Sequence, residues 1–81
     1  MGHFYFHVKD GGDLIQDEEG IELPSVEAAK RLALQTAREL LCQAVKAGKA
    51  TVPEAVVIAD DAGRQLDILP LAAVLPEPLK R

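Results

Sequence analysis

The sequence predicts an α+β domain, in which one long amphipathic helix packs on one face of a four-stranded antiparallel sheet in the order ββαββ. Apolar residues between 26 and 47 recur at spacings of three and four, the period of a helix with one buried side. Before and after this segment lie two pairs of short apolar stretches, and a glycine-containing turn joins the members of each pair, as in β-hairpins. One sheet that is covered by the helix on a single face is the simplest packing of these elements.

The first expected hairpin pairs a strand at residues 4–9 with a short return strand centred on Leu14 and Ile15, across a turn at residues 10–12. Successive side chains of a strand point to opposite faces of the sheet, so one set is buried and the other is uncovered. The alternation assigns Phe4, Phe6 and Val8 to the core, and His3, Tyr5, His7 and Lys9 to the uncovered face.

The helix is expected from residue 26 to about residue 47, and both of its ends carry sequence signals. Ser25 places a hydroxyl at the N-cap, and Gly48 provides a left-handed stop. Ile21 and Leu23 follow a turn at residues 17–20, and we expect them to lie beneath the first turn of the helix.

The second expected hairpin joins strands at residues 55–59 and 65–69 across the turn at residues 60–63. The pattern leaves the strand order open, with the first strand beside the third or the fourth. An apolar stripe of about 20 helical residues runs roughly 30 Å, whereas a strand of six spans about 20 Å. We expect the apolar segment at residues 71–75 to cover part of the excess helix and a second copy of the chain to cover the remainder.

A chain of 81 residues corresponds to one domain, here a core at residues 3–69 followed by an apolar, proline-containing tail at residues 70–81. Domains of this size bury only about 60% of their unfolded surface and often gain stability from oligomerisation. Cys42 is the single cysteine, so no intrachain disulfide can form, and we expect a homodimer. No leader-like segment or membrane-spanning apolar run is present, which predicts a cytoplasmic protein.

The charge distribution disfavours nucleic-acid binding. The net charge is −4, and residues 25–49, which contain the helix, are the only third of the chain with an excess of basic groups. A solvated helix face is therefore favoured over a phosphate-binding one, which requires a basic footprint. The basic side chains on that face are Lys30, Arg31, Arg38 and Lys46.

The catalytic inventory is small, and we predict neither an enzyme nor a cofactor. Cys42 lies deep in the helix with no feature that would stabilise a thiolate, and Ser25, the only serine, is explained by the helix cap. His3 and His7 are separated by roughly 13 Å along a regular strand, whereas nitrogen ligands lie about 2.0–2.1 Å from a shared zinc ion. These histidines cannot chelate one metal ion, and no metal site is predicted.

Several motifs resemble a family of short uncharacterised bacterial proteins that is frequent in rhizobia and related alphaproteobacteria. They are an aromatic strand at residues 3–8, an Asp-Gly pair at residues 10–11, the run Asp-Glu-Glu-Gly-Ile-Glu-Leu-Pro at residues 17–24, and an alanine-rich helix opening at residues 27–29. The resemblance covers residues 3–69 and implies no activity, because none is established for that family. The helix opening has a weaker, fold-level likeness to HicB-type antitoxins.

The function expected from the sequence is that of a small non-enzymatic interaction module, either homodimeric or bound to a protein partner. The candidate binding residues are His3, Tyr5 and His7, which form a semi-apolar row on the uncovered face. An antitoxin-type regulator that binds a protein partner is the alternative. A small-molecule or metal site at His7 with Asp13 or Asp17 is less favoured.

Overall fold

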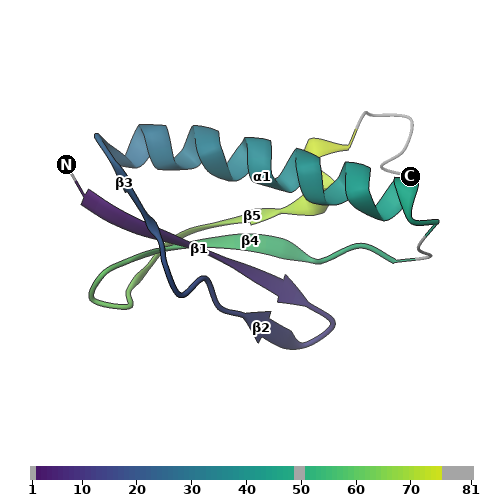
Figure 1. The fold of residues 1–81 in the computed structure, drawn as a ribbon, viewed down its shortest axis with the longest axis horizontal. Helices are drawn as coiled ribbons and strands as arrows, with labels where there is room; N and C mark the ends of the chain where they lie inside the picture. The colour runs from purple at the N-terminus through teal and green to yellow at the C-terminus, as the bar shows by residue number, and fades with distance from the viewer. Residues whose placement is uncertain (1, 49–50, 76–81) are drawn as a thin grey trace.

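The computed structural model describes residues 2–48 and 51–75 and forms an antiparallel sheet with one α-helix (Figure 1). This confirms the predicted α+β class and the single helix. The predicted four strands and the order ββαββ are wrong, because the described residues form a fifth strand before the helix. The elements in chain order are β1 (Gly2–Asp10), β2 (Asp13–Ile15), β3 (Ile21–Leu23), α1 (Val26–Lys46), β4 (Ala55–Asp60), β5 (Gln65–Pro70) and the 3-10 helix η1 (Leu71–Val74).

The additional strand, β3, exists because β1 is longer than its hairpin partner. β2 pairs only with the end of β1 at residues 8–10, which leaves the beginning of the same edge unpaired. The chain turns back after residue 20 and fills this edge, so that Ile21 lies opposite Phe4 and Leu23 opposite Gly2. Unpaired backbone groups on a strand edge are costly when they are buried, and β3 satisfies those at the start of β1.

The strands lie in the order β2-β1-β4-β5, with β3 on the same edge of β1 as β2. The first strand therefore lies beside β4, which resolves the order that the sequence left open. The register between β1 and β4 places Phe4 opposite Asp60 and Lys9 opposite Ala55. A register shift between Ile58 and Ala59 interrupts the pairing of β4 with β5.

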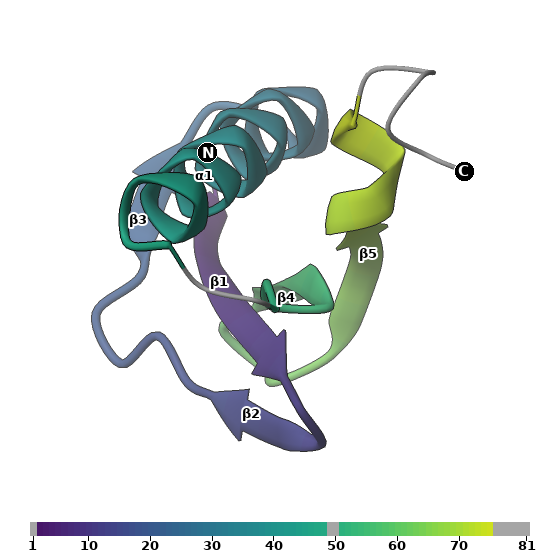
Figure 2. The same ribbon diagram turned by 90° about the vertical axis from the view of Figure 1, so that its right-hand side faces the viewer.

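α1 lies over one face of the sheet (Figures 1 and 2), and the core lies between the two. Phe4 is 6% exposed, while Phe6 is only partly buried at the margin of the core, so both lie on the face that the alternation predicted. Alanines on the buried side of α1 allow the helix axis to approach the sheet closely, since they fill little space. The buried core residues are Phe4, Ala29, Ala33, Ala37, Val56, Ile58 and Leu71.

Both ends of α1 match the sequence signals. The Ser25 hydroxyl accepts a hydrogen bond from the Ala28 N–H at 3.1 Å, and Gly48 adopts a φ of 69° just after the helix. η1 lies beside α1 (Figure 2), where Leu71 enters the core and Val74 packs against it. The rest of the predicted tail, residues 76–81, lies outside the described residues. No helix within residues 2–48 and 51–75 is both long and apolar enough to cross a membrane.

Candidate functional site

The three candidate binding residues lie in one row on β1, on the sheet face that α1 does not cover. The ring centroids of His3 and Tyr5 are 5.1 Å apart with the planes tilted by 59°. Those of Tyr5 and His7 are 6.3 Å apart, and the planes are nearly parallel at 15°. The structure therefore brings His3, Tyr5 and His7 together as the sequence predicted, and all three side chains are half-buried.

His3 connects β1 to the segment that leads into β3. Its Nδ1 lies 3.1 Å from a carboxylate oxygen of Glu22, and its Nε2 lies 2.8 Å from the backbone carbonyl oxygen of Glu19. The hydrogen bond to the Glu19 carbonyl, followed by the hydrogen bond to the Glu22 carboxylate, raises the pKa of His3 above its ordinary value. The nearby charge of Asp61 acts in the same direction.

His7 contacts the same segment through a different kind of hydrogen bond. Its Nδ1 accepts the backbone N–H of Asp17 at 3.0 Å. Both histidines thus hold the connection between β2 and β3, which we call loop 16–20 after its residues. Sequence reasoning placed these rings on a contact surface and missed that their nitrogens bond within the chain.

Asp17 occupies the gap between β2 and β3 on the edge of β1. One carboxylate oxygen accepts the N–H of Phe6 at 3.2 Å, and the other accepts the N–H groups of Glu19 and Gly20, also at 3.2 Å. Burial alone raises the pKa of Asp17, but the three N–H donors outweigh it and hold this pKa below its ordinary value. Asp17 thus holds the turn that the sequence predicts at residues 17–20, and its bond to Phe6 connects that turn to the edge of β1.

Gly20 is the point at which loop 16–20 comes closest to β1. A Cβ atom there would lie 2.6 Å from Nε2 of His3 and 2.8 Å from the carbonyl oxygen of Phe4, and φ is 66°. The spacing Asp-x-x-Gly therefore has a physical cause: the aspartate bonds the following amides, and only glycine fits where the chain then meets the strand. This spacing is the sequence signal that could have revealed the loop contact.

Large apolar side chains accompany the aromatic row on the same face. Leu14 is 49% exposed and Ile68 is 41% exposed, and both line a shallow concavity of ≈ 250 Å³ that also contacts Val57. Sequence reasoning missed these two residues, although they lie at alternating positions of strands that it predicted. The uncovered surface, which we call the open face, comprises His3, Tyr5, His7, Lys9, Leu14, Val57 and Ile68.

Charge is unevenly distributed along the open face. Lys9 lies at one end, opposite Leu14 and Ala55 in the sheet register. Glu22 lies opposite His3 at the other end, and Asp61 is close enough to act on the charge of His3. The open face therefore has one basic end, an aromatic and apolar centre, and one acidic end.

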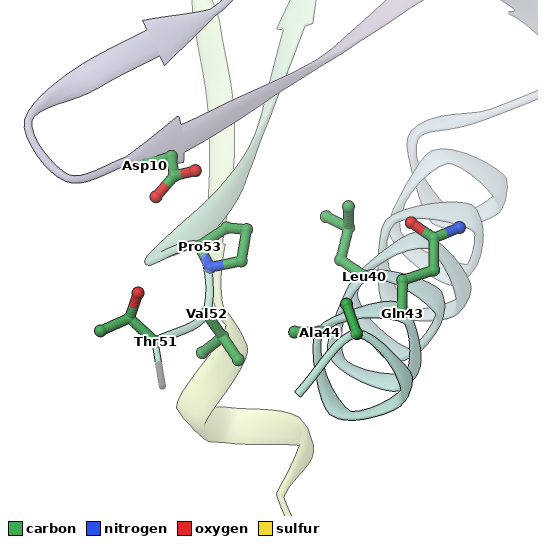
Figure 3. Close-up of a pocket in the computed structure, with 8 residues that line it drawn as sticks. Asp10, Leu40, Gln43, Ala44, Thr51, Val52 and Pro53 are labelled. Atoms are coloured by element: carbon green, nitrogen blue, oxygen red, sulfur yellow. The ribbon is translucent and has the colours of Figure 1, made fainter. Parts of the chain in front are cut away.

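A second pocket lies between the end of α1 and the segment that enters β4 (Figure 3). Its volume is ≈ 260 Å³, and Asp10 is the only ionisable side chain among the lining residues within 2–48 and 51–75. Leu40, Val52 and Pro53 supply much of its wall. Gln43 and Thr51 add an amide and a hydroxyl to this lining, and Asp10 has no ionisable partner among the described lining residues.

Metal binding at His7 has little support from the geometry. The Asp17 carboxylate already accepts three N–H groups, and Asp13 pairs with Asp10, which places it on the opposite face from His7. Across the described ranges, no cluster of three or more histidine, cysteine, aspartate or glutamate side chains could hold a metal ion. Cys42 is exposed on the helix.

Comparison with known protein families matches residues 3–72 to a Domain of unknown function, DUF6894. The chain belongs to this family. The DUF6894 match begins at His3 and ends within η1, so it includes the whole open face and loop 16–20. No curated protein and no solved structure matches the chain. The function of DUF6894 is unknown, as the sequence resemblance implied, and the open face is the feature of this chain that suggests one.

Proposed function

We propose that this domain is a non-enzymatic interaction module that forms a homodimer through the open face. The observation that carries the proposal is the apolar part of that face, where Ile68 is half-exposed beside Val57 at the centre and Leu14 is half-exposed next to Lys9. Neighbouring exposed apolar groups next to an aromatic row are typical of protein interfaces. A domain of this size also has little other means of enlarging its core.

The sheet edges favour association through the face. On β5, Pro70 has no N–H to offer, and the N–H of Ile68 donates to the Asp67 carboxylate at 2.8 Å. On the other side, β2 and β3 are only three residues long, and Asp17 fills the gap between them. Short edges, proline and internally satisfied donors all oppose the addition of a strand from another chain.

The charges of the open face favour a two-fold arrangement in which the strands of the two copies run in opposite directions. A two-fold axis through the centre brings the basic end of each copy over the acidic end of the other. Lys9 of one copy then approaches Asp61 and Glu22 of the second copy, while the apolar centres meet. Such charge complementarity fixes orientation more than it adds affinity.

Light scattering after gel filtration tests the proposal with two matched variants. We expect the wild type to have twice the chain mass and Ile68→Lys, which places a charge in the apolar centre, to be a folded monomer whose unfolding midpoint does not depend on protein concentration. Val45→Lys is the control, because Val45 is 71% exposed on α1 and away from the open face. A monomeric wild type at high concentration contradicts the homodimer, and equal masses of the two variants contradict the open face as its interface.

Light scattering also tests the orientation of the two copies, with variants of the charged residues. Lys9→Glu and Asp61→Lys should each weaken the dimer several-fold, and the double variant should recover most of the loss. If dimerisation is equally strong in these variants, the open face can still be the interface, but the two-fold orientation is wrong. An antitoxin-type regulator predicts a different result, namely a monomer that forms a stoichiometric complex with the product of a neighbouring gene.

A further inference from the structure

His3 and His7 attach the same loop to the same strand, but their hydrogen bonds demand different protonation states. Both nitrogens of His3 face acceptors, the Glu22 carboxylate and the Glu19 carbonyl. Nδ1 of His7 instead faces a donor, the backbone N–H of Asp17. These contacts lie within one chain, so the inference does not depend on self-association.

For His3, only the imidazolium form satisfies both contacts. A neutral imidazole carries one N–H and can donate to either Glu22 or Glu19, but not to both. The backbone carbonyl of Glu19 never donates, and the ionised Glu22 carboxylate only accepts. The raised pKa of His3 agrees with this requirement.

For His7, only a ring without a proton on Nδ1 satisfies the contact. The Asp17 N–H is a fixed donor, so Nδ1 must accept, and the proton of the neutral ring then resides on Nε2. Protonation of His7 would place two N–H groups against each other. The loop would then have to move at Asp17, whose carboxylate also holds Phe6, Glu19 and Gly20.

We propose that these two histidines make the attachment of loop 16–20 to β1 sensitive to pH, with the loop held most firmly when His3 is charged and His7 is neutral. Toward acid pH, His7 gains a proton at Nδ1 and loses the Asp17 N–H. Toward alkaline pH, His3 loses one of its two donors and releases either Glu22 or Glu19. Either change removes a side-chain hydrogen bond and leaves the loop attached to the edge of β1 mainly through the Asp17 carboxylate at the Phe6 N–H.

The surrounding charges act on the two rings from several elements. His3 is faced by Glu22 of β3, by the Glu19 carbonyl of the loop, by Asp61 of the turn after β4 and by the Tyr5 ring.

His7 is faced by Tyr5 and Lys9 of β1, by Asp17 of the loop, and by Asp60 and Asp61, which line the same concavity. Glu22 and Asp61 favour protonation of His3. What distinguishes the two histidines is the geometry of their contacts, two acceptors at His3 and one donor at His7.

Nuclear magnetic resonance of the full chain tests the pH-sensitive attachment of loop 16–20 directly. Ring nitrogen shifts should show the Nε2–H tautomer of the neutral His7 ring, and a His3 ring that carries protons on both nitrogens to above the ordinary pKa of histidine. Amide exchange of Asp17, corrected for the intrinsic pH dependence, should become about three- to tenfold faster as His7 is protonated, the effect of one lost hydrogen bond. The amide of Ile58 in the core is the internal reference and should not respond.

Two substitutions of His7 separate the acceptor from the titration. His7→Asn keeps a side-chain oxygen near the position of Nδ1 but does not titrate, so protection of the Asp17 amide should persist into acid. His7→Phe has no acceptor, and this amide should exchange rapidly at every pH while the unfolding midpoint shows that the fold remains. His3→Gln should abolish the alkaline change alone. An Nδ1–H tautomer of His7, or an acid response that survives in His7→Asn, overturns the proposal.

Discussion

The two faces of the sheet are stabilised by different physical means, although β1 contributes to both. On the covered face, Phe4 packs against the alanines of α1, and the residues buried in the described part of the chain include no charged or polar side chain. On the open face, His3 and His7 hold loop 16–20 through hydrogen bonds, together with Asp17 on the edge of β1. Apolar burial does not respond to the proton concentration, whereas these hydrogen bonds do. One strand therefore joins a pH-insensitive core to a pH-sensitive surface.

The largest expected effect distinguishes the two faces by side-chain truncation. Phe4→Ala should lower the free energy of unfolding by about 3 to 5 kcal/mol, the usual cost of removing a buried ring. Tyr5→Ser, one position along the strand, should cost about 1 kcal/mol, because the ring is half-buried and its main partners are His3 and His7. Urea unfolding in the Ile68→Lys background measures both without a contribution from self-association.

Equal costs for the two substitutions would mean that the faces are assigned wrongly. Phe4 is the better probe than Phe6, which the structure places at the margin of the core. A domain with a total stability near the lower end of the usual 5 to 15 kcal/mol would be largely unfolded by Phe4→Ala. In that case, Ile58→Val, with an expected cost of about 0.5 to 1.5 kcal/mol, is the measurable alternative on the covered face.

The second prediction concerns the contact between loop 16–20 and β1. Gly20→Ala should cost about 2 to 4 kcal/mol, because the new methyl group combines a positive φ with a collision against the carbonyl oxygen of Phe4. Gly12→Ala is the matched control, since Gly12 has a φ of 90° but no atom within 4 Å of the added Cβ. Its cost should be only the backbone part, about 1 to 2 kcal/mol.

The difference between the two glycine variants isolates the close approach of the loop. Thermal or urea unfolding measures it, and equal losses would show that the loop yields without cost. A smaller residue in place of His3 would remove one of the two collisions of the new methyl group. We do not expect it to restore the stability of Gly20→Ala, because the Phe4 carbonyl oxygen belongs to the backbone and cannot move aside. The close approach at Gly20 is therefore limited by the backbone of β1 and not only by the His3 side chain.

The covered face was predictable from the sequence because its signals are local and repeated. The helical period from residue 26 onward, the Ser25 cap and the alternation along β1 each involve neighbours in the chain. Burial of one side of each element follows from such patterns without any knowledge of the partner. The hairpin turns at residues 10–12 and 60–63 were predictable for the same reason.

The open face and its loop were less predictable because their contacts join residues far apart in the chain. β3 has only three residues, with one acid between two apolar side chains, and its pairing depends on an edge of β1 that β2 leaves free. The Asp17 carboxylate reaches Phe6, eleven positions earlier. The Asp-x-x-Gly spacing indicates that Asp17 bonds the amides of its own turn, but no local pattern specifies that the same carboxylate reaches the Phe6 N–H.

The smallest expected effect tests whether the two faces differ in their response to pH. The pKa of Asp17 is lower in the folded chain than its ordinary value, so the carboxylate binds fewer protons in the folded than in the unfolded state as the pH falls. Its contribution to stability is fully present above the ordinary pKa of about 3.9 and disappears as the pH falls through the folded value. Asp17→Asn should therefore be less stable than the wild type by about 1 kcal/mol near pH 6, and this difference should shrink in strong acid.

The covered face supplies the comparison for this titration. The stability difference between the wild type and Ile58→Val should stay constant from pH 6 to the acid limit, because neither side chain titrates. Urea unfolding at a series of pH values gives both curves. A constant difference for Asp17→Asn would show that the hydrogen bonds to Phe6, Glu19 and Gly20 do not depend on the charge of the carboxylate. If the stability difference for Asp17→Asn shrinks in acid while that for Ile58→Val stays constant, then the pH dependence of stability arises in loop 16–20 and not in the core.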